Sequence, residues 1–306
     1  MELFTLIALK LLPLYFFIAL GYVAGRFLKI ESNQIGALVI YIIMPFVFMT
    51  GLWASDIQAS NLSIIAIIFV MSAFMMGSGY VLCGLIYKGR SANLMASGLA
   101  TGNSGYFGIP VALALFDADL FGVYLLAAIA NSIFQITAGY YILALGQFNW
   151  QDSLKKLVRL PPLYGAVIGL ALMVLNVPIP DVVSETSATL KSAFVALGMM
   201  IIGLTLSSFD KIKFDFKFIT MAMFIRFCVW PALVFGVVAL DSFAFGGVFK
   251  DIYPIIILFG FLPIGADFAI YAANLNMYPQ RAATVVLFST LLAAFIIPLV
   301  YSLLQG

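Results

Sequence analysis

Polar side chains that could bind an ion occur in two apolar segments, each long enough to cross a bilayer. The first segment contains Asn103 and Ser104, and the second contains Asp267. Amides, hydroxyls and the free N–H groups at the start of a helix favour an anion, above all a carboxylate. An acid deep in a membrane costs about 2.5 kcal/mol or more and usually faces a cavity. These residue types predict an organic-anion site, with Asp267 binding a proton or cation or orienting a group that does.

The chain around Asn103 is not expected to continue as one regular helix. Pro110 lacks an N–H and its ring clashes with the carbonyl four residues earlier, while three nearby glycines relax the backbone. In a bilayer, broken backbone survives only where protein or a water-filled cavity satisfies its polar groups. Half-helices that meet at mid-bilayer form the substrate sites of many transporters. We therefore expect the substrate to bind at this helix break.

A structural alternative exists for both candidate residues. Asn103 could simply satisfy the backbone that Pro110 opens, and this role is compatible with ligand binding. Asp267 could be a buried acid that pairs with Arg226, with Lys10 or with a backbone N–H. The functional interpretation is favoured for Asp267 because it lies beside a second group of helix breakers, Gly260 to Gly265.

Other polar residues also lie within apolar segments. Asn131 and Gln135 are four residues apart, so they share a helix face and could either line a pocket or tie two helices together. Lys10 and Arg226 are expected to extend toward a membrane surface. The alternative for Arg226 is to pair with an acid or with a substrate carboxylate.

The composition is that of a polytopic membrane protein. Of the 306 residues, 64% are hydrophobic and 9% are charged, whereas about a quarter of the residues of a soluble domain are charged. The chain has no histidine, which removes the commonest catalytic base and metal ligand. Since the apolar segments also show no clear Ser–Lys or paired-Asp constellation, we expect no enzyme, no metal site and no cofactor. Basic patches with interleaved aromatics, as nucleic-acid binding requires, are missing.

Ten apolar runs have about the length that a membrane span needs, and they predict ten transmembrane helices. The first run is expected to be a retained span rather than a signal peptide, and Pro45 is expected to kink the second. The runs are Leu3–Val23, Ile35–Trp53, Leu62–Tyr87, Ala92–Phe116, Leu120–Leu145, Leu163–Val177, Leu190–Leu206, Phe218–Leu240, Ile252–Leu275 and Ala282–Leu304.

Basic residues in the connecting segments predict the orientation of the chain. If both termini lie outside, the outside loops hold two basic residues, Lys191 and Lys250. The inside loops then hold eleven, a bias that places both termini on the extracytoplasmic side of a plasma (inner) membrane. The eleven are Arg26, Lys29, Lys88, Arg90, Lys155, Lys156, Arg159, Lys211, Lys213, Lys217 and Arg281.

The longest inside connection, residues 146–162, separates two sets of five predicted spans, residues 1–145 and 163–306. Because each set has an odd number of spans, the second set runs inverted relative to the first, as in many transporters. The sequence therefore predicts an all-α membrane fold with a five-plus-five inverted repeat and a cytoplasmic linker.

The two groups of helix breakers take equivalent places in this repeat. One lies in the fourth predicted span and the other in the ninth. A shift of 160 residues places Gly265 on Gly105 and Pro263 on Asn103. We therefore expect helices four and nine to be broken and to form one site together.

Residues 103–110 resemble the signature of a known family. The run Asn-Ser-Gly-Tyr-Phe-Gly-Ile-Pro is similar to the Asn-x-Gly-x-x-Gly-Ile-Pro motif in the fourth span of the auxin efflux carrier (PIN-like) family. The pattern from Tyr41 to Pro45, Pro263, and the closing Ser289-Thr290…Pro298 pattern agree with this resemblance. The resemblance covers the whole chain, whose short central connection is like that of the prokaryotic members.

The resemblance implies a fold, a mechanism and a class of substrate. The fold is the inverted repeat of sodium/proton antiporters and bile-acid symporters, with helices 4 and 9 broken and crossing. Helices 1, 2, 6 and 7 would form a scaffold, and helices 3–5 and 8–10 a transport domain that moves by an elevator mechanism. Relatives carry small organic anions, such as auxin or mono- and dicarboxylates including malonate and malate, and tend to be homodimers.

The substrate site that follows lies where the two broken helices cross. Asp267 is the residue expected to couple a sodium ion or a proton. Two other functions stay open: a sodium/proton antiporter of the same architecture that uses Asp267, and a membrane receptor without transport. The expected substrate-binding residues are Asn103, Ser104, Gly105, Tyr106, Gly108, Pro110, Asn131, Gln135, Pro263 and Gly265.

Overall fold

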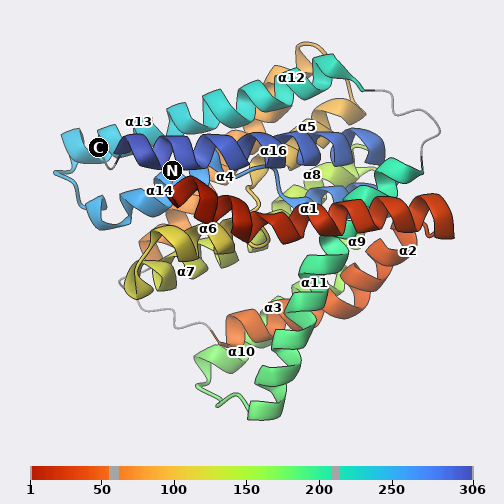
Figure 1. Cartoon of the computed structure of the whole chain (residues 1–306), viewed down its shortest axis with the longest axis horizontal. Coiled ribbons are helices and arrows are strands. Elements are labelled where there is room, and N and C mark those ends of the chain that lie inside the picture. Colours follow the sequence, from red (N-terminus) through yellow and green to blue (C-terminus); the bar gives the residue numbers. More distant parts are fainter. Residues whose placement is uncertain (1, 55–61, 209–213, 305–306) are drawn as a thin grey trace.

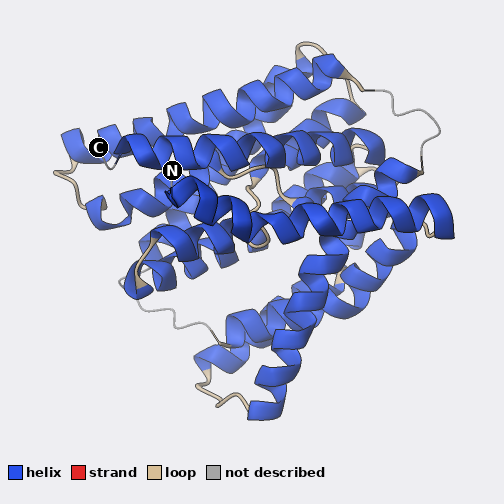
Figure 2. Cartoon of the chain, in the orientation of Figure 1, coloured by secondary structure: helices blue, strands red, loops and turns tan. Residues whose placement is uncertain are grey.

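The computed structural model describes residues 2–54, 62–208 and 214–304, and these ranges fold into helices joined by short loops (Figures 1 and 2). Figure 2 shows no strand in them, and their β-type pairing is an isolated antiparallel bridge between Gly102 and Ile264. The all-helical class predicted from the sequence is confirmed. The Lys10 side chain, Lys211 and Lys213 lie outside the described part.

Several apolar runs of the sequence are divided between two or three helical elements. Breaks separate α5 from α6 and α14 from α15, and single π-helical turns interrupt other runs. The elements are α1 (Glu2–Leu28), α2 (Ser32–Leu38), η1 (Val39–Ile43), α3 (Met44–Trp53), α4 (Leu62–Gly84), α5 (Arg90–Ala100), α6 (Gly108–Leu115), α7 (Ala118–Phe134), η3 (Gln135–Gly139), α8 (Tyr140–Leu145), α9 (Trp150–Val158), α10 (Pro161–Val174), α11 (Asp181–Ser207), α12 (Phe216–Phe224), η4 (Ile225–Val229), α13 (Trp230–Ala244), η5 (Lys250–Ile252), α14 (Tyr253–Phe261), α15 (Ala266–Asn274) and α16 (Pro279–Leu304).

Six helices of the described chain are long and apolar enough to cross a membrane, and a seventh span results if α9 and α10, bent by 50°, cross as one. The remaining predicted runs fall in the apolar part of α1, in α10 and in the two broken pairs, whose halves are short. The membrane-protein class is thus confirmed, and the count of ten spans stays a prediction. The six are Ser32–Trp53, Ser63–Gly84, Asp119–Leu145, Asp181–Ser207, Phe216–Ala244 and Pro279–Tyr301.

Two helical segments extend beyond the apolar runs of the sequence. Helix α11 begins at Asp181 rather than at Leu190. Residues 181–189 are mostly polar, which ended the apolar run, but they contain no Gly or Pro that would stop a helix. Helix α9 lies within the predicted linker, where the Asn149 side chain accepts a hydrogen bond from the Asp152 N–H at 2.8 Å. The length of an apolar run therefore underestimates the full extent of a helix.

Two π-helical turns immediately precede prolines. Turn η1 ends one residue before Met44, and Pro45 is the second residue of α3. Turn η4 stands in the same relation to Pro231, the second residue of α13. A proline donates no N–H and displaces the carbonyl four residues earlier, and one wider turn accommodates both effects. The distortion expected at Pro45 takes this form.

Glycines bring two pairs of helices into close contact. Gly21 and Gly25 of α1 face α11, and Gly165 and Gly169 of α10 face α3. A Cβ atom at Gly21, Gly165 or Gly169 would overlap the main chain of the partner helix. Small residues spaced four apart are a common device for close helix packing in membranes. Figure 1 shows α3 and α10 together, apart from α12 and α13, with α11 running from them toward α16.

Candidate functional site

The two helix breaks meet in space, although about 160 residues separate them in the sequence. Residues 101–107 join α5 to α6, and residues 262–265 join α14 to α15. The Asn103 N–H donates a hydrogen bond to the Pro263 carbonyl at 2.7 Å, next to the antiparallel bridge. Each break thus satisfies part of the backbone that the other exposes, as burial in a membrane requires.

The glycines of the first break allow close contacts, and Pro110 lies just after the break. Helix α6 begins at Gly108, so Pro110 falls in its first turn, where a missing N–H costs little. A Cβ at Gly108 would overlap the Tyr124 hydroxyl, which donates to the Ser104 carbonyl at 2.6 Å. A Cβ at Gly102 would lie 2.6 Å from a nitrogen of the Arg226 guanidinium.

Asn103 is 3% exposed and uses its two amide atoms differently. Its Oδ1 accepts a hydrogen bond from the Phe107 N–H at 3.2 Å, near the start of α6. Its Nδ2 is buried and has no hydrogen-bond partner among the described residues. Since a buried donor without a partner costs about 1–3 kcal/mol, the amide oxygen has a structural role and the nitrogen remains available to a ligand.

Asn131 and Gln135 both contact the chain at the first break. Asn131 accepts a hydrogen bond from the Gly102 N–H at 3.2 Å and donates to the Gly102 carbonyl and the Ser104 hydroxyl, each at 2.9 Å. Gln135 Oε1 accepts from the Thr101 hydroxyl at 2.7 Å, whereas its Nε2 is buried with no partner in the described chain. Asn131 therefore holds the break in place, and Gln135 resembles Asn103 in leaving one donor free.

Removing the Asn131 amide is expected to loosen the first break. Asn131→Ala deletes three buried hydrogen bonds, so we expect the free energy of unfolding to fall by about 2–3 kcal/mol. Thermal unfolding of the purified protein in detergent measures the loss, with Asn33→Ala, at an exposed amide on α2, as control. Equal melting temperatures for the two variants would contradict the bracing role.

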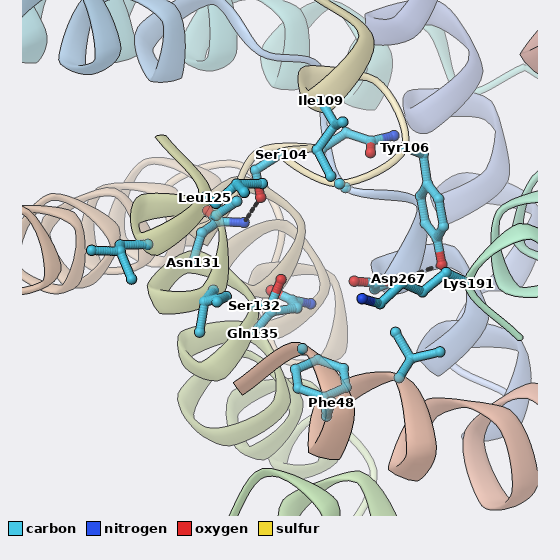
Figure 3. Close-up of a pocket in the computed structure, with 18 of the residues that line it drawn as sticks. Phe48, Ser104, Tyr106, Ile109, Leu125, Asn131, Ser132, Gln135, Lys191 and Asp267 are labelled. Atoms are coloured by element: carbon cyan, nitrogen blue, oxygen red, sulfur yellow. Dashed lines mark hydrogen bonds between the residues drawn. The ribbon is translucent and has the colours of Figure 1, made fainter. Parts of the chain in front are cut away.

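A cavity of about 800 Å³ opens beside the crossing. Figure 3 shows Asn131, Gln135, Tyr106 and Asp267 around it. Three predicted site residues do not line the cavity in the described chain and instead shape the backbone behind it: Gly108, Pro110 and Pro263. The predicted site residues that line the cavity are Asn103, Ser104, Gly105, Tyr106, Asn131, Gln135, Gly265 and Asp267.

Asp267 lies in the first turn of α15, partly buried at the cavity. Its Oδ1 accepts a hydrogen bond from the Tyr106 hydroxyl at 3.2 Å. A carboxylate at a helix N-terminus is stabilised by the free N–H groups and the partial positive charge there. The described residues include no group of three or more His, Cys, Asp or Glu side chains that could hold a metal ion.

Arg226 is 0% exposed, so the expectation that it extends toward a membrane surface is wrong. Its Nε donates to the Leu262 carbonyl at 2.5 Å and its Nη2 to the Phe259 carbonyl at 3.2 Å. The guanidinium also lies 4.6 Å from the ring centre of Trp230, whose Nε1 donates to the Leu99 carbonyl at 2.9 Å. Arg226 thus offsets the partial negative charge at the end of α14, and its neighbour Trp230 satisfies a carbonyl at the end of α5.

The opposite wall of the cavity was not predicted from the sequence. That wall comes from α3 and α11, and includes Phe48, Lys191, Phe194 and Val195. On α11 the three residues lie at positions i, i+3 and i+4, so they share one helix face. The spacing was visible in the sequence, but the run from Leu190 to Leu206 is apolar on most sides and does not show which face lines a cavity.

A membrane chain with two broken helices that cross beside a cavity with buried polar groups has the organisation of a membrane transporter. A family model described as "Membrane transport protein" matches residues 6–301. The chain therefore belongs to this family, which includes the auxin efflux carriers, and the predicted resemblance is confirmed. Its relatives are membrane transporters, not enzymes.

Three similar proteins come from an archaeon and two plants. An uncharacterized transporter of Methanocaldococcus jannaschii is 27% identical over 246 residues, which cover 77% of this chain and 78% of the relative. Auxin efflux carrier component 2 of Arabidopsis thaliana is 31% identical over 155 residues, covering 49% of this chain and 23% of the carrier. The rice protein of the same name, from Oryza sativa, is 32% identical over 157 residues, covering 49% and 24%. The matches to the plant carriers span about a quarter of those proteins.

Proposed function

We propose that the chain is a secondary active or facilitative transporter of small organic anions, which bind where α5/α6 cross α14/α15. The proposal rests on two buried amide nitrogens without described partners, Asn103 Nδ2 and Gln135 Nε2, from residues that line one cavity. A carboxylate can accept hydrogen bonds from both, and bonds to a charged group are the stronger ones.

The N-terminal ends of the half-helices also favour a negatively charged ligand. Helices α6 and α15 both begin beside the cavity, at Gly108 and Ala266. Their first N–H groups carry partial positive charge, which favours an anion. Gly105 and Gly265 line the cavity without a Cβ atom, which leaves the backbone near each helix start open to a ligand.

The rest of the lining indicates an organic substrate. Phe48, Leu52, Leu126 and Phe194 form much of the apolar wall. A pocket with a few polar groups on an apolar background suits a ligand with a charged end and a hydrocarbon body. Auxin-like aromatic acids have this character. Mono- or dicarboxylates such as malonate or malate share the charged end but have little hydrocarbon, and they belong to the proposal through the family resemblance. We include coupling to sodium or protons through Asp267 in the proposal. We propose no cofactor.

Helix packing supports an elevator mechanism with two bodies. Helix α11 packs on α1 and α3, and α3 also packs on α10, which together correspond to predicted spans one, two, six and seven. The remaining spans pack among themselves, α4 with α5 and α7, α13 with α14, and α16 with α12, α14 and α15. Helices α15 and α16 also pack on α11, which makes them the contact between the two groups. We propose the first group as scaffold and the second as transport domain.

The glycine contacts support the five-plus-five inverted repeat. The pair α1–α11 joins predicted spans one and seven, and the pair α3–α10 joins spans two and six. Exchanging the two halves of the chain converts one pair into the other. Both pairs use glycines spaced four apart, on the first span of each half. We propose residues 1–145 and 163–306 as the repeats.

The cavity opens among helix ends that the basic-residue bias places outside. Ala54 follows α3, and Asp119 lies in the first turn of α7. We therefore propose that the structure is open toward the extracytoplasmic side of a plasma membrane, with both termini on that side. A homodimer in the bilayer is part of the proposal.

A sodium/proton antiporter is the second candidate, favoured by the partly buried Asp267 carboxylate in the cavity. A thermal-shift screen separates the candidates, because a ligand present at 100 times its Kd stabilises the folded state by about 2.7 kcal/mol. We expect malonate, malate or indole-3-acetate to raise the melting temperature, whereas an antiporter should respond to sodium and to none of these acids.

Stabilisation by sodium that disappears in Asp267→Asn, with no effect of any of the acids, would favour the antiporter and contradict the anion proposal. Uptake of the stabilising acid into reconstituted vesicles completes the test. An acid that binds without flux would indicate the receptor alternative, and transport would then be excluded. Asp251→Asn, on an exposed acid outside the cavity, is the matched control.

A further inference from the structure

The charged residues of the cavity are unevenly distributed. Among the lining residues that the structure describes, Asp119 and Asp267 are acids and Lys191 is the one cation. An anion approaching the crossing would meet a negative wall if Lys191 were neutral. We propose that Lys191 is a specificity-determining residue, whose ammonium contacts the bound anion and offsets the Asp267 charge. This inference rests on the proposed function.

The packing of α11 places Lys191 on the correct side of the cavity. Phe194, one turn further along α11, contacts the Tyr106 ring with 4.9 Å between ring centres. A Cβ at Gly198, one more turn along, would lie 3.0 Å from the Tyr106 hydroxyl, the group that donates to Asp267. The same face of α11 therefore covers the Tyr106–Asp267 pair and carries Lys191.

The side chain of Lys191 extends toward that pair. Figure 3 shows Lys191 reaching into the cavity toward Asp267, with Asn131 and Gln135 on the other side. The residue is exposed, so it keeps contact with water at the mouth of the cavity. A flexible ammonium on a four-carbon stem can neutralise the Asp267 carboxylate when the site is empty and contact the anionic group of a ligand when the site is filled.

The proposed contact also joins the two bodies of the transporter. Lys191 belongs to α11, in the group proposed as scaffold, whereas Asn103 and Asp267 belong to the crossing helices. An anion that touches both Lys191 and the crossing amides is held between these groups. Lys191 then determines affinity, while the amides of the crossing position the anion for transport.

Equilibrium binding of radiolabelled malonate and indole-3-acetate to the purified full chain tests the inference. We expect Lys191→Gln to weaken binding of the preferred acid at least about tenfold, the change that a loss of 1.4 kcal/mol produces. Lys191→Arg, which keeps the charge, is expected to bind more tightly than Lys191→Gln. Lys250→Gln is the matched control, since Lys250 is exposed outside the cavity.

A double variant tests the specific role of Asp267. If Lys191 offsets the Asp267 charge, Lys191→Gln/Asp267→Asn should bind the acid at least threefold more tightly than Lys191→Gln alone. An unchanged Kd in Lys191→Gln, or a loss that Asp267→Asn does not relieve, would overturn the inference and leave the proposed function standing. Wild-type protein that binds neither acid would overturn both.

Discussion

Asn103→Asp is expected to lower organic-anion uptake at least about 100-fold, because it removes a hydrogen bond to a charged group and adds repulsion. Aspartate has the shape of asparagine and keeps the oxygen that accepts the Phe107 N–H. It replaces the buried Nδ2, which has no partner in the described chain, with a negatively charged oxygen. The variant therefore removes the ligand-binding atom while keeping the structural one. Uptake of labelled malonate and indole-3-acetate into reconstituted vesicles is the measurement.

Two further variants separate ligand binding from folding. Asn103→Ala loses both amide atoms, so it should abolish uptake and also lower stability by about 1 kcal/mol through the lost hydrogen bond from the Phe107 N–H. Asn176→Asp, at an exposed amide away from the cavity, should change neither property. If Asn103→Asp transports at the wild-type rate with unchanged KM, the amide nitrogen is not a ligand and the proposed site is wrong.

Arg226→Leu is expected to destabilise the protein by about 3 kcal/mol or more, since it deletes two buried hydrogen bonds from a charged donor. The Phe259 and Leu262 carbonyls would lose their donors, and the end of α14 would lose its compensating charge. Thermal unfolding in detergent and the yield of monodisperse protein measure the loss. Arg226→Lys should lie between the wild type and Arg226→Leu, because one ammonium does not reproduce the guanidinium fork.

An exposed arginine is the control for the loss of stability expected in Arg226→Leu. Arg159, exposed just after α9, should tolerate replacement by leucine within about 0.5 kcal/mol. Equal melting temperatures for Arg226→Leu and Arg159→Leu would contradict the role of Arg226 at the crossing.

The helix breaks could be predicted because their cause is local. Gly102, Asn103 and Pro110 are visible as interruptions in an apolar run, and Pro263 marks the second interruption. Their meeting in space followed from the odd number of spans in each half, a property of the order of the elements. The antiparallel bridge between the breaks agrees with that expectation.

The role of Arg226 depended on packing that the sequence does not show. Its acceptors are carbonyls of Phe259 and Leu262, more than thirty residues away, and a helix break exposes them. A buried cation without a nearby acid looked like a side chain that reaches the membrane surface. Backbone carbonyls at a helix end supplied the partner instead.

The α11 wall was missed for a related reason. Helix α11 is apolar on most sides in the bilayer, so hydrophobic periodicity does not separate a lipid-facing side from a cavity-facing one. The glycine pairs were different, since Gly21 and Gly25 repeat the spacing of Gly165 and Gly169. Comparing equivalent spans of the two halves would have revealed them.

A structure of the purified protein with a bound brominated aromatic acid tests the central claim most directly. We expect the carboxylate to lie about 3 Å from Asn103 Nδ2 and Gln135 Nε2, with the ring against Phe48 and Phe194. Bromine signal at another place in the protein, or a carboxylate beyond hydrogen-bonding reach of both amides, would contradict the claim that the helix crossing is the substrate site.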